Sequence, residues 1–204
     1  MTAAGAVERP GIRRLRVLSA VAAGAMVLVG CTSTAPEAAD PAKASLVEQH
    51  QLAGLDARQV IDQLDAMPVA ERPDDLWASV EPGQLVLSDP TGERAETVLA
   101  MPAEEFYLSV APYETRTHDC YFHSLTTCLG EMSGEPVQVT VTDDATGATI
   151  VDETRATYDN GFVGLWLPRD LEGTLTITRG DTSASSPVST GDDDLTCLTT
   201  MQLT

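Results

Sequence analysis

The segment 136-PVQVTVTDDATG-147 has the pattern of a half-buried β-strand that runs into a tight turn. Val137, Val139 and Val141 alternate with polar residues, so a strand would place all three valines on the same face. Asp, Thr and Gly then gather at 144–147, which is typical of a turn. β-Branched side chains in strict alternation favour a sheet with one face against a core, so this segment predicts antiparallel β-structure.

Short apolar or alternating segments recur before and after this strand, and turn residues separate them. Asn160-Gly161 is the strongest hairpin signal in the chain, because this pair suits the turn that joins two adjacent strands. Roughly seven short strands from Gln84 onward, with turns about every 8–12 residues, predict an antiparallel β-sandwich, which we place at residues 106–204. The other predicted strands are Phe106–Val110, Phe162–Leu167, Leu175–Ile177 and Leu195–Leu203.

The region ahead of this sandwich has a different pattern. Asp56 can cap a helix, and apolar residues recur after it at helical spacing until Pro68 ends the run. Gln84–Leu87 then predicts a short strand. We therefore expect a small α+β N-terminal region over residues 46–105, in a chain that is mainly β. The apolar positions of the predicted helix are Val60, Ile61, Leu64 and Met67.

The N-terminus predicts export. Arginines precede an apolar run at 17–29, which is too short to cross a bilayer, since a spanning helix takes about 20 residues. The run ends in 28-LVGC-31, which resembles a bacterial lipobox, so residues 1–30 are predicted to be a lipoprotein signal peptide and Cys31 the lipidated residue. Residues 31–45 are small and polar, and are predicted to be a flexible tether. The alternative is an ordinary signal peptide with a cysteine at its cleavage site by chance.

The exported chain is strongly acidic. The whole chain has 12 basic and 31 acidic residues, and residues 1–30 hold four of the former and one of the latter, which leaves 8 and 30 and a net charge of −22. A surface of this charge repels nucleic-acid phosphates and anionic lipid headgroups, so we exclude nucleic-acid binding. A solvated surface on an exported protein explains the same charge without any acidic site.

The segment 118-HDCYFHSLTTC-128 holds two of the four cysteines and two of the three histidines. If Cys31 carries lipid, Cys120, Cys128 and Cys197 remain, an odd number for an oxidising compartment. One interpretation is structural, with one disulfide and one buried, inert thiol. A second is a thiol–disulfide oxidoreductase, but such enzymes place two residues between their cysteines at a helix start, and seven separate Cys120 from Cys128.

The third interpretation is a metal site. Three thiolates on one ion suit a soft metal, above all Cu(I). Zn²⁺ would take a fourth ligand, which His118 or His123 could supply. Threonines lie beside Cys128 and Cys197, and their hydroxyls, together with backbone N–H groups of the loop, could hydrogen-bond the sulfur atoms. From the residue types alone, the structural and the metal interpretations both stay open.

The segment 118–128 resembles the signature of the CueP-type extracytoplasmic copper-binding proteins, and weaker matches extend the resemblance over residues 52–204. The resemblance implies a Cu(I) site of three cysteines, which fall at Cys120, Cys128 and Cys197. It also implies a smaller N-terminal region followed by a β-rich C-terminal domain, and it allows a homodimer. The other matching segments are 160–162, 166–170 and 196–203, with weaker matches at 54–68 and 106–113.

The resemblance implies a function as well. The family is associated with copper handling outside the cytoplasm: sequestration under stress, delivery to a secreted cuproenzyme and, in some accounts, reduction of Cu(II). We expect no enzyme, because reduction by thiols would consume them stoichiometrically. The expected partners are a copper ion, with Zn²⁺ as a competitor, and an extracytoplasmic cuproenzyme or a membrane copper exporter. The expected location is the outer face of the cytoplasmic membrane, through the lipid on Cys31, or the periplasm and cell envelope.

The two histidines keep two interpretations. His118 and His123 are either a first landing place for Cu(II), which imidazole suits, or hydrogen-bonded loop residues. The alternative for the whole chain is a lipid-anchored β-sandwich interaction module that binds no metal and has a Cys120–Cys128 disulfide. Which cysteines are bonded to each other helps to separate the metal site from this metal-free alternative.

Overall fold

The computed structural model describes residues 45–94 and 96–204. The predicted signal peptide, the lipidated Cys31 and all but the last residue of the predicted tether lie outside the described residues. Within the described part, no helix is long and apolar enough to cross a membrane. The described elements are mainly antiparallel strands with a few short helices near the N-terminal side, which confirms the predicted fold class.

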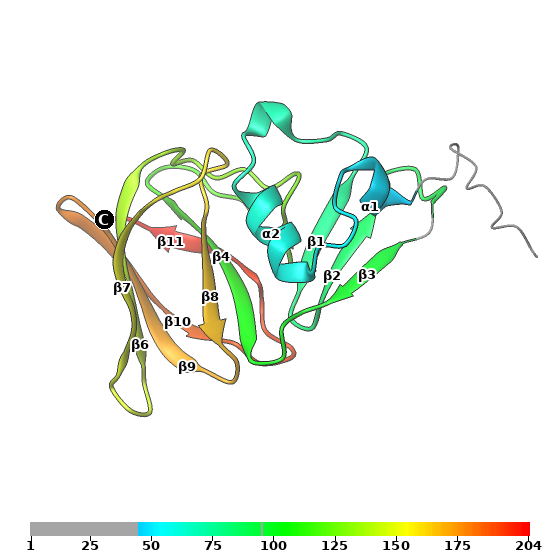
Figure 1. The fold of residues 1–204 in the computed structure, drawn as a ribbon. Coiled ribbons are helices and arrows are strands. Elements are labelled where there is room, and N and C mark those ends of the chain that lie inside the picture. The colour runs from blue at the N-terminus through cyan, green and yellow to red at the C-terminus, as the bar shows by residue number, and fades with distance from the viewer. Residues whose placement is uncertain (1–44, 95) are drawn as a thin grey trace, which may run out of the picture. The chain divides into compact units, whose positions relative to one another are not determined.

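The N-terminal region is a helix packed on a four-stranded antiparallel sheet of order β3-β2-β1-β5 (Figure 1). Helix α2 begins as predicted: the Asp56 carboxylate accepts the N–H of Gln59 at 2.9 Å, and the Gln59 side chain accepts the N–H of Asp56 at 3.0 Å. Met67 lies just beyond the end of this helix. The elements are α1 (Leu46–Gln49), α2 (Ala57–Asp65), the 3₁₀ helix η2 (Val69–Glu71), β1 (Trp77–Glu81), β2 (Gln84–Ser88), β3 (Thr97–Ala100) and β5 (His123–Ser124).

The β-rich part consists of two sheets that share one hydrophobic core. Val137, Val139 and Val141 lie in this core with Leu175 and Ile177 of the next strand in the sheet, as their alternation predicts. One sheet has the order β10-β9-β6-β7 and the other β11-β4-β8. The strands are β4 (Glu105–Tyr113), β6 (Pro136–Asp143), β7 (Thr149–Ala156), β8 (Val163–Pro168), β9 (Glu172–Arg179), β10 (Thr182–Ser189) and β11 (Cys197–Gln202).

Two connections differ from a simple series of hairpins. Asn160-Gly161 forms a turn, but the hairpin prediction is wrong, because β7 pairs with β6 and β8 pairs with β4 in the other sheet. The last strand, β11, runs parallel to β4, whereas the other pairings between described strands are antiparallel. Alternation along one strand shows which face is buried but not which strand lies beside it, so neither pairing was predictable.

A two-residue strand links the two parts of the fold. β5 comes from the long connection between β4 and β6, yet it pairs with β1 through Ser79↔Ser124 and Val80↔His123. The sheet of the N-terminal region therefore takes a strand from beyond residue 105, where the sequence predicts a boundary. The division at residue 105 stays a prediction.

We expect Gly161→Ala to destabilise the fold more than Gly147→Ala. Both glycines have positive φ, +81° and +72°, so both variants suffer backbone strain. A Cβ at residue 161 would also lie 2.7 Å from the carbonyl carbon of Gly130, whereas a Cβ at residue 147 meets nothing within 4 Å. The added collision should cost about 1–3 kcal/mol in urea unfolding. Equal losses in the two variants would contradict this close approach.

Candidate metal centre

Two distant segments bring the three cysteines together. Cys120 and Cys128 lie in the connection between β4 and β6, on either side of β5, and Cys197 is the first residue of β11. The N–H groups of Thr196 and Cys197 both donate to the carbonyl oxygen of Tyr121, at 3.0 and 3.1 Å. These bonds hold the start of the last strand against the connection that carries the other two cysteines.

The three sulfur atoms form one cluster. Cys120 and Cys197 are joined by a disulfide, with 5.6 Å between their Cα atoms. The free thiol of Cys128 has its Sγ 3.5 Å from the Sγ of Cys120 and within 4.8 Å of the Sγ of Cys197. The Cys120–Cys128 disulfide expected for the metal-free alternative is therefore wrong, because β11 carries Cys197 onto Cys120 and leaves Cys128 beside the bond.

The chemistry of this donor set suits a soft metal. Sulfur ligands select Cu(I) over harder ions, and a cluster of three sulfur atoms matches that preference. The side chain of Cys197 is buried and that of Cys128 is half-buried, so an ion here would be largely shielded from water. The disulfide occupies two of the three donors, so only the reduced chain presents three thiolates.

Cys128 has the surroundings of a thiolate. The backbone N–H of Ser124 points to its Sγ at 3.4 Å. Burial raises the pKa of Cys128. The hydrogen bond and charge of His123, together with the Ser124 N–H, lower it by more, so the net pKa is below its usual value. The expected backbone N–H partner is thus present at Ser124, but two of the expected threonine hydroxyls bond elsewhere: that of Thr196 to Val80 and His123, and that of Thr127 to Ser124.

His123 is fully buried on the inner side of the cluster. Its Nδ1 lies 3.7 Å from the Sγ of Cys197, and its Nε2–H donates to the carboxylate of Asp65 at 2.9 Å. Burial lowers the pKa of His123, but the charge of Asp65 and the bonds to Asp65 and Cys128 outweigh it and raise the pKa to about 9. The inner imidazole is therefore fixed in orientation by Asp65, and the neighbouring acidic groups favour its protonated form.

Asp65 is the buried partner that the sequence reasoning missed. It ends α2, and its carboxylate also accepts the hydroxyls of Tyr107 and Ser109, at 2.6 and 3.3 Å, and the amide of Asn160 at 2.7 Å. Burial raises the pKa of Asp65, but the charge and hydrogen bond of His123, with the bonds from Tyr107 and Asn160, outweigh it, so the net pKa is lowered. A signal was present, because Asp65 lies one helical turn after Ile61, on the apolar face of the predicted helix.

His118 lies on the outer side of the cluster. One of its ring nitrogens and the Sγ atoms of Cys120 and Cys128 lie within 4.8 Å of one another. Its Nε2 is buried and has no hydrogen-bond partner within residues 45–94 and 96–204, and its ring meets that of Phe162 edge-on, with 6.1 Å between centroids. A pocket of about 450 Å³ opens beside it. The two predicted histidines therefore lie near the sulfur atoms in different surroundings: His123 is enclosed by protein, and His118 lies beside an open pocket.

A sequence model described as "Periplasmic copper-binding protein CueP" matches residues 59–202, well over half of the chain. The chain belongs to the CueP family. It is also similar to the protein in a crystal structure of S.CueP, with 42% identity and a TM-score of 0.73, over 82% of this chain and 100% of that one. No curated protein matches the chain.

The CueP match confirms the resemblance drawn from segment 118–128 and indicates copper binding in the periplasm. In the described part of the chain, two groups of side chains could hold a metal ion, and both lie in the sulfur cluster. They are His118, Cys120 and Cys128, and His123, Cys128 and Cys197. Cys128 is common to both groups, so either candidate set of metal ligands depends on it.

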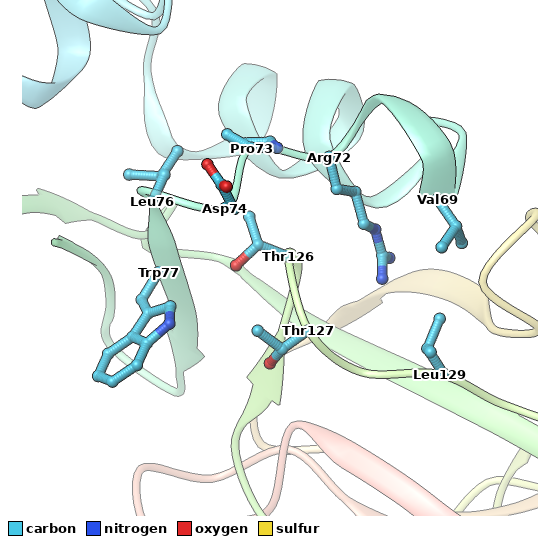
Figure 2. Close-up of a pocket in the computed structure, with 9 residues that line it drawn as sticks. All are labelled: Val69, Arg72, Pro73, Asp74, Leu76, Trp77, Thr126, Thr127 and Leu129. Carbon is cyan, nitrogen blue, oxygen red and sulfur yellow. The ribbon is translucent and has the colours of Figure 1, made fainter. Parts of the chain in front are cut away.

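A second pocket, of about 370 Å³, adjoins the same connection in this CueP-family chain (Figure 2). Figure 2 shows Arg72 extending between Val69 and Leu129, and its Nη1 donates to the carbonyl oxygen of Cys128 at 2.8 Å. Burial lowers the pKa of Arg72, although the charges of nearby acidic groups oppose it. None of the sulfur or imidazole donors lines this pocket, so Arg72 contributes by fixing the backbone at Cys128.

Glu131, near the end of the connection between β4 and β6, bonds to residues 114–116 at the start of that connection. Its carboxylate accepts the N–H groups of Glu114, Thr115 and Arg116, at 2.8, 2.9 and 3.2 Å, and also the hydroxyl of Thr115. The Thr115 hydroxyl and these three N–H groups lower the pKa of Glu131 from 4.5 to about 2. The segment that leads to His118 is thus held by one carboxylate.

We expect the amide signals of residues 114–116 to change together as Glu131 is protonated. A carboxyl with a depressed pKa stabilises the fold above its unfolded pKa, and this contribution is lost as the pH falls through about 2. NMR titration of the amides should therefore show a common midpoint near 2. Glu131→Gln should remove this titration, whereas Glu172→Gln, at an exposed position on β9, should leave it. A midpoint near 4.5 would contradict the anchoring role.

Proposed function

We propose that this chain holds Cu(I) through the thiolates of Cys120, Cys128 and Cys197, for copper sequestration, resistance or delivery outside the cytoplasm. The observation that carries the proposal is the convergence of the three sulfur atoms from two distant segments. Membership of the CueP family supports it, because the family is described as periplasmic copper-binding. The trigonal arrangement of three soft donors favours Cu(I) over Zn²⁺, which takes a fourth ligand.

The disulfide gives the proposal a redox condition. Two Cu(II) ions that each take one electron from the thiols of Cys120 and Cys197 would yield two Cu(I), one disulfide and two protons. Such a step consumes the thiols once for each pair of ions, so it is stoichiometric, and we do not assign the chain as an enzyme. Tight binding of Cu(I) then requires an external dithiol to reduce the disulfide.

The predicted lipid on Cys31 would restrict where copper can be exchanged. A chain tethered to the outer face of the cytoplasmic membrane reaches only nearby partners, because a flexible tether of residues 31–45 has a limited span. Scavenging at the membrane, or exchange with a membrane copper exporter or an extracytoplasmic cuproenzyme, suits such a chain. A homodimer stays a prediction.

The proposal is tested by an anaerobic titration of the reduced full chain with Cu(I) against a strong competing chelator, with free thiols counted before and after. We expect one copper ion per chain and protection of three thiols. The disulfide form should compete far less well, since it retains one thiol at the cluster. Failure of the reduced chain to compete for copper would favour the metal-free interaction module, for which the Cys120–Cys197 disulfide would then be structural.

A further inference from the structure

His118 is a donor for which the three-thiolate site has no use. One of its ring nitrogens nevertheless lies within 4.8 Å of the Sγ atoms of both Cys120 and Cys128. Its Nε2 is buried without a hydrogen-bond partner among the described residues, and buried polar atoms are usually paired with protein, water or an ion. Both observations indicate a ligand beside this ring.

The two sides of the sulfur cluster differ in access to solvent. His118 lines the open pocket of about 450 Å³, together with Leu129 and Glu131. Cys197 is 1% exposed, and His123 behind it is fully buried and bonded to Asp65. An ion that arrives from solvent therefore meets His118 before it meets Cys197.

We propose that His118, Cys120 and Cys128 form a capture position for Cu(I), from which the ion moves to the three-thiolate site. The inference rests on the proposed function. In the transfer, the bond from copper to the imidazole nitrogen of His118 breaks and a bond to the thiolate of Cys197 forms. Cys120 and Cys128 stay bound throughout, and copper keeps its oxidation state because no electron moves. One soft ion is thus exchanged between overlapping positions by replacement of a single ligand.

The arrangement of the donors explains why the movement would run inward. Three thiolates satisfy Cu(I) better than two thiolates and one imidazole, because sulfur is the softer ligand. His123 does not replace Cys197 in this scheme, since its Nε2–H is bonded to Asp65 and its Nδ1 faces the Sγ of Cys197 at 3.7 Å. The outer imidazole receives the ion and the inner sulfur retains it.

The Cys197→Ser chain isolates the capture position, because it lacks the inner sulfur but keeps His118 and two thiols. We expect this reduced full-length variant to bind one Cu(I) more weakly than the parent. Adding His118→Ala to it should weaken binding by a further factor of about ten or more, the size of effect that loss of a metal-site partner produces. In the parent chain, His118→Ala should leave the final affinity nearly unchanged but slow the uptake of Cu(I) from its bicinchoninate complex.

Two further variants keep the test decisive. His50→Ala removes the one histidine outside the cluster and should change neither affinity nor uptake in either background. His118→Met, which offers a thioether in place of the imidazole, should restore part of the lost binding in the Cys197→Ser chain, since thioethers also suit Cu(I). Circular dichroism verifies that each variant is folded.

Three results would overturn the capture position. Binding by the Cys197→Ser chain that is indifferent to His118→Ala would show that the ring is not a ligand. An equal loss of affinity in the parent and in the Cys197→Ser chain would make His118 a resident ligand instead. Unchanged uptake in the parent His118→Ala chain would remove its role in capture. Failure of the parent to bind Cu(I) at all would refute the proposed function and not this inference alone.

Discussion

Cys128→Ser is expected to abolish tight Cu(I) binding while the fold survives. Cys128 belongs to both groups of described side chains that could hold a metal, so neither group is complete without it. The loss of affinity should exceed the roughly 100-fold that removal of an outer partner of a metal ligand costs. The measurement is competition with a Cu(I) chelator, carried out on the reduced full chain.

The fold should tolerate this change because Cys128 is half-buried and forms no disulfide in this structure. A serine keeps nearly the same shape, so the melting temperature of the oxidised variant should match that of the parent within a few degrees, about the effect of 0.5 kcal/mol. Thr127→Ala, at an exposed neighbouring position, is the matched control and should bind copper as the parent does. Unchanged affinity in the Cys128→Ser chain would refute the three-thiolate site.

Asp65→Ala should be the most destabilising of the single substitutions considered, by about 3–5 kcal/mol, because it removes the partner of His123 from a fully buried ion pair. It also removes the acceptor for the hydroxyl of Tyr107 and the amide of Asn160, both of them buried. Unpaired buried polar groups add to the loss of the ion pair. Urea unfolding of the reduced, metal-free chain measures the effect.

Two further variants serve as a control and as a milder test of this prediction. Gln63→Ala, on the exposed face of the same helix, should change the free energy of unfolding by less than about 0.5 kcal/mol. Tyr107→Phe removes a single hydrogen bond to the Asp65 carboxylate and should cost about 1.5–3 kcal/mol, so a graded effect is measurable even if Asp65→Ala fails to fold. A loss below about 1 kcal/mol for Asp65→Ala would mean that the ion pair with His123 contributes little to the fold.

The position of Asp65 connects the N-terminal helix to the metal centre. Asp65 ends α2, and it bonds to His123 of β5 and to Asn160 of the turn between β7 and β8. With its bonds to Tyr107 and Ser109 of β4, one buried carboxylate thus holds four segments that are far apart in the sequence. Its partner His123 contacts the Sγ of Cys197, so the helix sets the inner wall of the sulfur cluster.

The strands and the capped helix were predictable, because they depend on local patterns. The alternation at Val137–Val141 and the cap at Asp56 each correspond to an element in the structure. The parallel pairing of β11 with β4 was not predictable, since strand alternation carries no information about the neighbouring strand. That pairing delivers Cys197 to the cluster, so the convergence of the cysteines followed from the family resemblance and not from their spacing.

The details of the candidate centre depended on packing and were also beyond local patterns. The bond from Cys120 to Cys197 follows from the hydrogen bonds that hold β11 against Tyr121. The different surroundings of His118 and His123 follow from which ring the fold encloses, although both rings lie in the same segment of eleven residues. The residue types alone indicated which side chains could bind a metal ion, whereas the tertiary structure shows where each of them lies in the sulfur cluster.

X-ray absorption at the copper edge would identify the atoms bound to copper. The sample is the reduced full chain loaded with one equivalent of Cu(I) under anaerobic conditions. We predict the edge of Cu(I) and a first coordination shell of three sulfur atoms, supplied by Cys120, Cys128 and Cys197. A first shell made of nitrogen and oxygen atoms, or the edge of Cu(II), would contradict this prediction.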